Sequence, residues 1–282
     1  MPEQVSAYVV ISDIHAGCQL GLYPCNIPQG GLLLDEGGEY TPNAIQRGMW
    51  AWWDEFWGEY VPEMTNGLPY GVIVNGDSLD GKHHDAVHQI THNLSTQQRI
   101  AEAILRPIVA LCEGRFYMIR GTEAHVGPSG QQEEMLASAL GAIKSDIGQY
   151  ARHELWKKIG RHSMVHIAHT IGGTSSQSYE STAVHKEYVE ALAESARWGN
   201  RAPDAVVRSH RHRYFETMIA TERGRGRGIV TPGWQAKTPF AHKIAGGRNS
   251  QPQFGGVVLI ESPGGEFYTR SKVWSIQRPE AE

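Results

Sequence analysis

The stretch Val5-Ser-Ala-Tyr-Val-Val-Ile-Ser-Asp-Ile-His15 decides the fold, because a short apolar run ends there on two side chains that commonly bind metal ions. A run of apolar, β-branched residues with little alternation predicts a strand that is buried on both faces. Asp13 and His15 are therefore expected where the carboxyl end of this strand meets the first loop. In open α/β sheets, that edge carries the functional groups.

Three later runs end in the same way, and they are Tyr70–Asp77, Ser163–His169 and Asp204–His212. Several strand ends would thus deliver carboxylate and imidazole groups to one edge, as a polynuclear metal site requires. Helical patterns follow Asn43, Ser95 (with a capping box to Gln98), Gln131 and Thr182, and a β-rich segment begins at Tyr214. The predicted fold class is α/β.

Length and composition narrow the possibilities further. A chain of 282 residues accommodates one large catalytic domain. We predict a single domain over residues 1–276, with a long Gly- and Pro-rich loop at 16–42 that forms a functional rim or flap, and a loose tail at 277–282. The net charge of −4 argues against a surface that generally coats polyanions. Fourteen histidines, mostly clustered, suggest metal binding.

Cellular location is predicted from cysteine usage and from the absence of targeting patterns. Cys18, Cys25 and Cys112 are an odd number without metal-ligand spacing, which favours free thiols in a reducing compartment. The amino terminus lacks a cationic segment ahead of an apolar core, and no stretch is apolar for the ~18 residues that a membrane span needs. A soluble, cytoplasmic protein without membrane contact is expected.

The candidate metal ligands share one feature, which is their position at or just after a predicted strand. They are Asp13, His15, Asp77, the turn Gly121–His125, His169, His210 and His212. Each has a structural alternative when taken singly, such as a helix cap or a hydrogen-bonded core histidine. Aspartate oxygens and imidazole nitrogens together suit Mn, Fe, Zn or Ni. A carboxylate can bridge two such ions about 3.5–4 Å apart, an arrangement suited to phosphoester hydrolysis.

The ordered set of motifs resembles the calcineurin-like metallophosphoesterase superfamily over residues 5–214, about three quarters of the chain. The family motifs Asp-x-His, Gly-Asp, Gly-Asn-His-Glu/Asp, His and Gly-His-x-His correspond to Asp13-Ile-His15, Gly76-Asp77, Gly121-Thr-Glu-Ala-His125, His169 and Ser209-His-Arg-His212. The resemblance implies a four-layer α-β-β-α sandwich. It also implies a dinuclear centre of two divalent transition-metal ions.

The resemblance also implies roles for the matched residues. The ligands of the first metal would be Asp13, His15 and His212, and those of the second would be His169 and His210. Asp77 would be the bridging carboxylate. A hydroxide that bridges the two ions would then attack the phosphorus atom in line. This is the mechanism expected of a phosphodiesterase or a broad-specificity phosphoesterase.

The third motif departs from the family pattern. Thr122 stands where the family has an asparagine ligand, and Glu123 stands where it has a histidine. Either the turn is rebuilt, with Glu123 as a ligand and His125 as the general acid, or the second site lacks one ligand. The acidic and imidazole groups within the turn favour a rebuilt turn.

Substrate contacts are predicted from residues near the motifs. Lys82, His83 and His84 follow the loop of Asp77 and are candidates to hold a phosphate or a leaving group, with surface solvation as the alternative. Trp234 is a candidate to stack on an aryl or base group, and core or lid packing competes equally. The run Arg223, Arg225, Arg227 resembles a basic hairpin tip that either contacts a polyanion or is an ordinary solvated turn.

Two alternative functions remain open at the level of sequence. One is a DNA nuclease of the repair-exonuclease branch, with nucleic acid as the phosphoester substrate. The other is a non-catalytic scaffold on a degenerate phosphatase fold. Oligomeric state is undetermined, and a dimer is compatible with the Trp-rich helix and the long first loop.

Overall fold

The chain forms two mixed β-sheets with helices, in a computed structural model that describes residues 5–27, 32–35, 37–83, 85–173, 177–222, 224–243 and 250–276. The strands are β1 (Ala7–Ile11), β2 (Gly71–Asn75), β3 (Phe116–Ile119), β4 (Ala151–Arg152), β5 (Glu154–Ile159), β6 (Ser163–Ala168), β7 (Ala205–Arg208), β8 (Phe215–Thr221), β9 (Gly224–Val230), β10 (Gln253–Glu261) and β11 (Phe267–Ser275). The helices are α1 (Ala44–Glu55), the π-helix η1 (Phe56–Tyr60), α2 (Val61–Thr65), α3 (Leu94–Leu111), α4 (Glu123–Val126), α5 (Gln131–Ala139), the 3-10 helix η2 (Gln177–Tyr179), α6 (Glu180–Arg197) and α7 (Pro239–Lys243).

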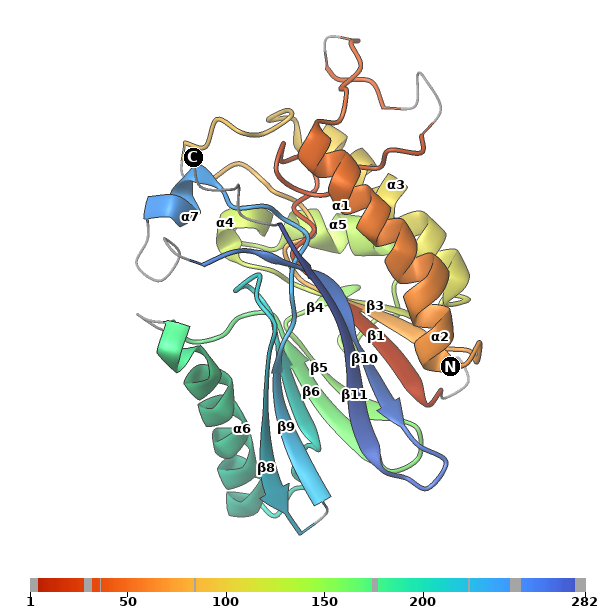
Figure 1. The fold of residues 1–282 in the computed structure, drawn as a ribbon, viewed down its shortest axis with the longest axis vertical. Helices are drawn as coiled ribbons and strands as arrows, with labels where there is room; N and C mark the ends of the chain where they lie inside the picture. Colours follow the sequence, from red (N-terminus) through yellow and green to blue (C-terminus); the bar gives the residue numbers. More distant parts are fainter. Residues whose placement is uncertain are drawn as a thin grey trace.

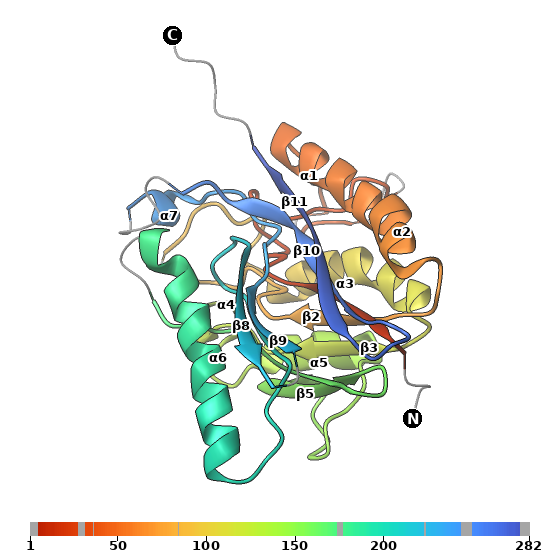
Figure 2. The same ribbon diagram turned by 60° about the horizontal axis from the view of Figure 1, so that its bottom comes forward.

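The first sheet has the strand order β11-β10-β1-β2-β3-β4, and the second has the order β5-β6-β7-β9-β8. Strands β1 to β4 pair in parallel, whereas β10 and β11 are antiparallel additions at one edge. In the second sheet, β6, β7 and β9 are parallel. Figures 1 and 2 show α1, α2 and α3 beside the first sheet and α6 beside the second, on opposite sides of the molecule. The predicted α/β class is confirmed.

Strand β1 lies inside the first sheet and is buried on both faces, as predicted. Its odd-numbered side chains, from Ala7 to Ile11, pack into a hydrophobic cluster with the helices. Tyr8 and Val10 point the other way, into a cluster shared with the second sheet. This alternation follows from the two-residue period of a strand. A strand that is covered on both faces requires a run of apolar residues without polar positions.

The second sheet is covered on its outer face by α6. Val184 and Tyr188 of α6 form a third hydrophobic cluster with Val206 and Val230. The opposite face of the same strands contributes Val207 and its neighbours to the cluster between the sheets. Hydrogen bonds among Ser12, Ser209 and Thr231 join the loops that follow β1, β7 and β9, so these loops of the two sheets meet at a common edge.

The structure confirms one predicted helix cap and contradicts another. Asn43 begins α1 with a complete capping box to Gln46. For α3 the predicted cap Ser95 is wrong, because the side chain of Asn93 accepts hydrogen bonds from the backbone N–H groups of Ser95 and Thr96. An asparagine two residues upstream satisfies two of the open N–H groups at once.

The Trp-rich helix that begins after Asn43 packs in the core. Trp50 and Trp57 are buried, whereas Ile45 is 40% exposed. Residues 16–23 of the predicted loop 16–42 are not a free flap, because bridges join Ala16 to Leu79 and Gly21 to Gln235. Residues 28–31 and 36 of that loop and the predicted tail 277–282 lie outside the described residues. The single domain over residues 1–276 stays a prediction.

Two further observations concern predictions from composition. Cys18, Cys25 and Cys112 are free thiols. Within the described ranges, no helix is both long and apolar enough to cross a membrane. The cytoplasmic location stays a prediction.

Candidate metal centre

Left-handed backbone turns follow the strands that carry the candidate metal ligands. The φ angles are 53° at Asp13, 47° at His15, 49° at Asp77, 70° at His210 and 50° at His212. Aspartate and histidine tolerate this conformation better than most residues with a side chain, although it is still unfavourable. The chain reverses sharply at each strand end. The turns therefore bring side chains distant in sequence into one cluster.

One half of this cluster consists of Asp13, His15 and His212. The Nε2 atoms of His15 and His212 are 3.2 Å apart, and His212 Nε2 is 3.3 Å from Asp13 Oδ1. Two ligands on one ion, each about 2.0–2.2 Å from it, lie roughly 3.0–3.5 Å from each other. Asp13 Oδ1 is buried and accepts no hydrogen bond. These three side chains therefore fit a divalent cation.

The other half consists of Asp77, His169 and His210, again with Asp13. Asp77 Oδ2 is 3.0 Å from His169 Nε2 and 3.7 Å from His210 Nδ1. Asp13 Oδ1 lies 3.9 Å from His169 Nε2. Four potential ligand atoms here, one from each residue, lie within 4.8 Å of one another. Asp77 also groups with His15 and His125, so its carboxylate lies between the two halves.

Hydrogen bonds orient His169 toward this group. Its Nδ1 lies 2.6 Å from the backbone oxygen of Asn75, which can only accept, so Nδ1 carries the proton. Nε2 lies 3.0 Å from Asp77 Oδ2, and in a neutral ring it would carry the lone pair that metal ligation requires. The Asn75 side chain in turn donates to Ala168 O and to Ser209 Oγ. One asparagine thus links the ends of β2, β6 and β7.

Buried hydroxyl groups join further strand ends. Thr231 Oγ1 is 2.8 Å from Ser12 Oγ and 2.7 Å from Ser209 Oγ. These residues follow β9, β1 and β7, respectively. The backbone N–H of Trp234 also donates to Asp13 O at 2.9 Å. Together these hydrogen bonds hold the loops of the two sheets in register.

Two glycines leave room for the ligands. A Cβ atom at Gly76 would lie 2.4 Å from His169 Nδ1, and one at Gly121 would lie 2.0 Å from Asp77 Oδ1. Side chains at either position would displace a candidate ligand. The glycines that precede Asp77 and Thr122 are therefore required by the packing of the site.

The third motif is rebuilt around Thr122 rather than Glu123. The backbone N–H of Thr122 donates to Asp77 Oδ1 at 2.7 Å, and its hydroxyl lies 3.2 Å from each carboxylate oxygen. Glu123 is exposed and belongs to none of the metal-ligating groups found among the described residues. His125, on α4, does reach the cluster, beside His15 and Asp77.

His125 is held in a defined tautomer. Its Nδ1 lies 2.6 Å from the backbone oxygen of Asp80 and must donate, which leaves Nε2 as the atom available for chemistry. Burial, with a contribution from the neighbouring His15, lowers the pKa of His125 to about 4. The free ring is therefore mostly neutral at pH 7.

The charges of the cluster favour a cation. Burial works to raise the pKa of Asp77, but the charge of His169 and its hydrogen bond outweigh burial and hold that pKa well below its ordinary value. Burial likewise works to lower the pKa of His169, yet Asp77, with a further contribution from Asp13, raises it to about 10. Two buried carboxylates thus attract protons onto the adjacent imidazoles. A bound divalent ion would replace these protons.

Two residues at the site were not identified from the sequence. Glu133 of α5 is fully buried and accepts hydrogen bonds from the backbone N–H groups of Ser78, at 2.9 Å, and Gly121, at 2.5 Å. Burial, together with the charge of Asp77, raises the pKa of Glu133 to about 7. Asp80 Oδ1 lies 3.4 Å from His15 Nδ1, the arrangement of a carboxylate that orients a metal-bound histidine. Asp80 could have been identified from the sequence, because it is a second acidic residue three positions after Asp77. Nothing in the helical pattern around Glu133 distinguishes that residue.

The predicted substrate contacts have mixed outcomes. Lys82 is exposed, while His83 turns toward the interior, with Nε2 3.5 Å from Asp80 Oδ2. His84 lies outside the described residues. For Trp234 the core-packing alternative is confirmed and stacking on a substrate is not, because the side chain is 0% exposed and packs among Trp53, Phe56 and Trp274. Although Trp234 lies in a loop, its apolar indole ring is buried by the aromatic side chains around it.

The basic hairpin lies away from the cluster. Arg225 and Arg227 are at the start and middle of β9, and the loop that approaches Asp13 follows the end of that strand. At about 3.3 Å per residue, Arg225 is roughly 17 Å from that end. Arg227 also forms an ion pair with Glu216. Arg223 lies outside the described residues.

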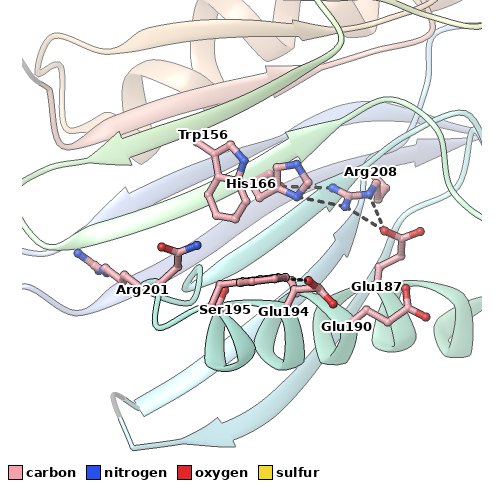
Figure 3. Close-up of a pocket in the computed structure, with 11 residues that line it drawn as sticks. Trp156, His166, Glu187, Glu190, Glu194, Ser195, Arg201 and Arg208 are labelled. Atoms are coloured by element: carbon pink, nitrogen blue, oxygen red, sulfur yellow. Dashed lines mark hydrogen bonds and ion pairs between the residues drawn. The ribbon is translucent and has the colours of Figure 1, made fainter.

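A cavity of about 460 Å³ lies between α6 and the outer face of the second sheet (Figure 3). Trp156 and His166 stack there, with ring centroids 4.5 Å apart, and Arg208 is bound by Glu187 at 2.9 Å. None of its lining residues belongs to the cluster at the strand ends. Since its Arg208 and Glu187 already neutralise each other, this cavity does not offer the chemistry of the cluster.

Comparison with known proteins yields only weak structural likenesses. No protein-family model and no curated protein matches the chain. Vps29 of Chaetomium thermophilum is 11% identical with a TM-score of 0.36, covering 98% of this chain and 100% of that one. The Thermotoga maritima protein TM1076 is 12% identical with a TM-score of 0.35, covering 96% and 100%. A hypothetical protein of Thermus thermophilus is 13% identical with a TM-score of 0.38, covering 95% and 99%. Likenesses this weak do not identify a family.

Proposed function

We propose that this chain is a metal-dependent phosphoester hydrolase with a dinuclear centre, on the four-layer fold of the calcineurin-like metallophosphoesterases. The observation that carries the proposal is the pair of ligand groups around Asp13 and Asp77, whose nearest ligand atoms are 3.0–3.3 Å apart. Such spacing matches ligands that share an ion. The preferred substrates are phosphodiesters or a broad range of phosphoesters.

Each half of the cluster has a role in this proposal. Asp13, His15 and His212 would hold one ion, and His169 and His210 the other, with Asp77 between them. Divalent ions at these positions supply Lewis acidity toward a phosphoryl oxygen and lower the pKa of bound water. Thr122 holds the Asp77 carboxylate in place through two hydrogen bonds to Oδ1.

His125 is the proposed proton donor to the leaving oxygen. Its Nδ1–H is engaged by Asp80 O, so the transferred proton has to be carried on Nε2. A pKa of about 4 makes the protonated ring a strong acid that is scarce at neutral pH. His125→Ala should therefore slow hydrolysis of alkyl esters, which are poor leaving groups, much more than that of activated aryl esters. Equal slowing of both substrate types would remove His125 from this role.

The proposal is tested by hydrolysis of bis(p-nitrophenyl) phosphate, p-nitrophenyl phosphate, an aryl phosphotriester and single-stranded DNA, with Mn, Fe, Zn or Ni supplied. We expect aryl diester hydrolysis that depends on added metal and is lost in His169→Asn. His153→Asn is the matched control, since His153 is exposed and lies outside the metal-ligating groups.

The same panel separates the alternatives. DNA hydrolysis that exceeds diester hydrolysis and falls with salt would favour the nuclease. Bound metal without hydrolysis of any substrate would favour the scaffold. Failure to bind transition metal, with no hydrolysis, would refute the dinuclear proposal.

A further inference from the structure

A second group of potential ligands includes Asp80 but none of the proposed ligands of the dinuclear centre. Cys18, Asp80 and His88 each offer one ligand atom, and the three atoms lie within 4.8 Å of one another. Cys18 and Asp80 are fully buried. His88 Nε2 is buried and has no hydrogen-bond partner. A thiol, a carboxyl and an imidazole thus converge in the interior.

The backbone holds these three residues in fixed relative positions. Gln19 N donates to His88 O at 2.8 Å, and Asp80 N donates to Ala16 O at 2.9 Å. An antiparallel bridge joins Cys18 to Gln89. The segments around 18, 80 and 88 are therefore connected to one another without any ion, so the group is preorganised. Small side-chain rotations would bring the ligand atoms to the roughly 3–4 Å separation expected on one ion.

The surroundings suit a thiolate that is neutralised by a cation. The backbone N–H of Leu20 donates to Cys18 Sγ at 3.3 Å, a contact that stabilises negative charge on sulfur. Without a cation, burial, reinforced by the charge of Asp80, raises the pKa of Cys18 to about 12, so the thiol stays protonated. The groups that face His88 are Asp80, His83 and His15. A divalent ion would compensate both Asp80 and the ionised thiol.

We propose that Cys18, Asp80 and His88 form a third metal site, specific for a borderline ion of the Zn²⁺ class. Sulfur and imidazole ligands select zinc over magnesium or calcium, and three protein ligands leave one tetrahedral position for solvent. Binding releases the thiol proton to solvent. The ion ties the first loop to the loop that follows β2. It also fixes Asp80, whose Oδ1 lies 3.4 Å from His15 Nδ1.

The test uses Co²⁺ as a spectroscopic probe of the full-length protein after chelation of all metals. A cobalt–thiolate bond gives a charge-transfer band in the near ultraviolet, whereas the proposed dinuclear centre has no sulfur ligand. We expect this band in the wild-type protein, with about three ions bound per chain by elemental analysis. Cys18→Ser should lose the band and one ion. Cys25→Ser and Cys112→Ser are matched controls and should retain both.

Two further variants keep the outcome decisive. His88→Asn, at a partly exposed position, should lose one ion without a change in the melting temperature of the metal-free protein, and it decides the matter if Cys18→Ser does not fold. Asp77→Asn should keep the thiolate band even when it loses the dinuclear ions. A cobalt-loaded wild-type protein without the band, or a band that persists in Cys18→Ser, overturns the third site and leaves the dinuclear proposal intact. No bound cobalt at all overturns both.

Discussion

Replacing Asp77 by asparagine should remove the charge that draws cations into the cluster while keeping the shape of the side chain. In the metal-free protein, Asp77 is the main cause that opposes burial and raises the pKa of His169 from 6.5 to about 10. A rise of this size corresponds to on the order of 5 kcal/mol of differential interaction with the proton. A divalent ion held by the same side chains would carry more charge than a proton. The free energy of ion binding that is lost in Asp77→Asn should be at least comparable with this value. It corresponds to a roughly thousandfold or larger loss of affinity for the ion.

Two measurements test this expectation. Histidine resonances of the metal-free protein, followed by NMR against pH, should show a much lower pKa of His169 in Asp77→Asn, since burial is then opposed only by the charge of Asp13 and by the hydrogen bond to the Asn75 backbone. Calorimetric titration with Mn²⁺ should show that both ions of the dinuclear centre bind more weakly, because Asp77 groups with ligands of both halves. Asp146→Asn is the control, as it removes an equal charge from an exposed position.

The reasoning is refuted if Asp77→Asn binds both ions with wild-type affinity. It is equally refuted if the pKa of His169 stays near 10, because another group would then have to supply the charge. Loss of one ion only would restrict Asp77 to one half of the cluster and exclude a bridging role.

Three further predictions follow from the geometry and charges of the site. Gly121→Ala places a Cβ 2.0 Å from Asp77 Oδ1, so it should weaken metal binding and lower the unfolding free energy, measured by urea titration, by about 1–3 kcal/mol. The control is Gly48→Ala, because Gly48 lies in α1 with open space around it. This variant should raise the unfolding free energy by about 0.5–1 kcal/mol. Because His169 remains protonated in the metal-free protein up to about pH 10, metal binding should release protons and strengthen as pH rises toward that value; calorimetry in buffers of different ionisation enthalpy that detects no proton release would contradict this. The pKa of Glu133 rises from about 4.5 to about 7 on folding, so the contribution of Glu133 to the stability of the metal-free protein should be greatest below pH 4.5 and fall by on the order of 3 kcal/mol as pH rises through 7. In urea unfolding, Glu133→Gln should reduce the fall in stability between pH 4.5 and 7 relative to the wild-type protein, and an identical pH dependence in both proteins would assign the fall to another group.

The strand ends of this protein were predictable because their signals are local. A continuous apolar run such as Ala7–Ile11 needs cover on both faces, and its burial places the next polar residues at a sheet edge. Asp13, His15 and Asp77 were found in this way, and so were His169 and the pair His210 and His212. The type and order of the side chains at these ends were sufficient to predict that they converge.

Other features depended on contacts between segments that are distant in the chain. Thr122 rather than Glu123 reaches Asp77, because the direction of each side chain is set by the turn before α4. Trp234 joined the core instead of the substrate site, because Trp53 and Phe56 surround its position. Glu133 approaches from α5 and has no distinguishing pattern in the sequence.

By itself, then, the sequence determined the class of fold and the set of ligands that gather at the sheet edge, since burial and strand period act over a few residues. Only the tertiary structure decided which atoms lie within ligand distance, which carboxylates support them, and that Cys18 lies beside Asp80 and His88. Those outcomes depend on how loops from separate strands pack, because a shift of about one ångström decides whether a side chain can bind the ion or only lies near it.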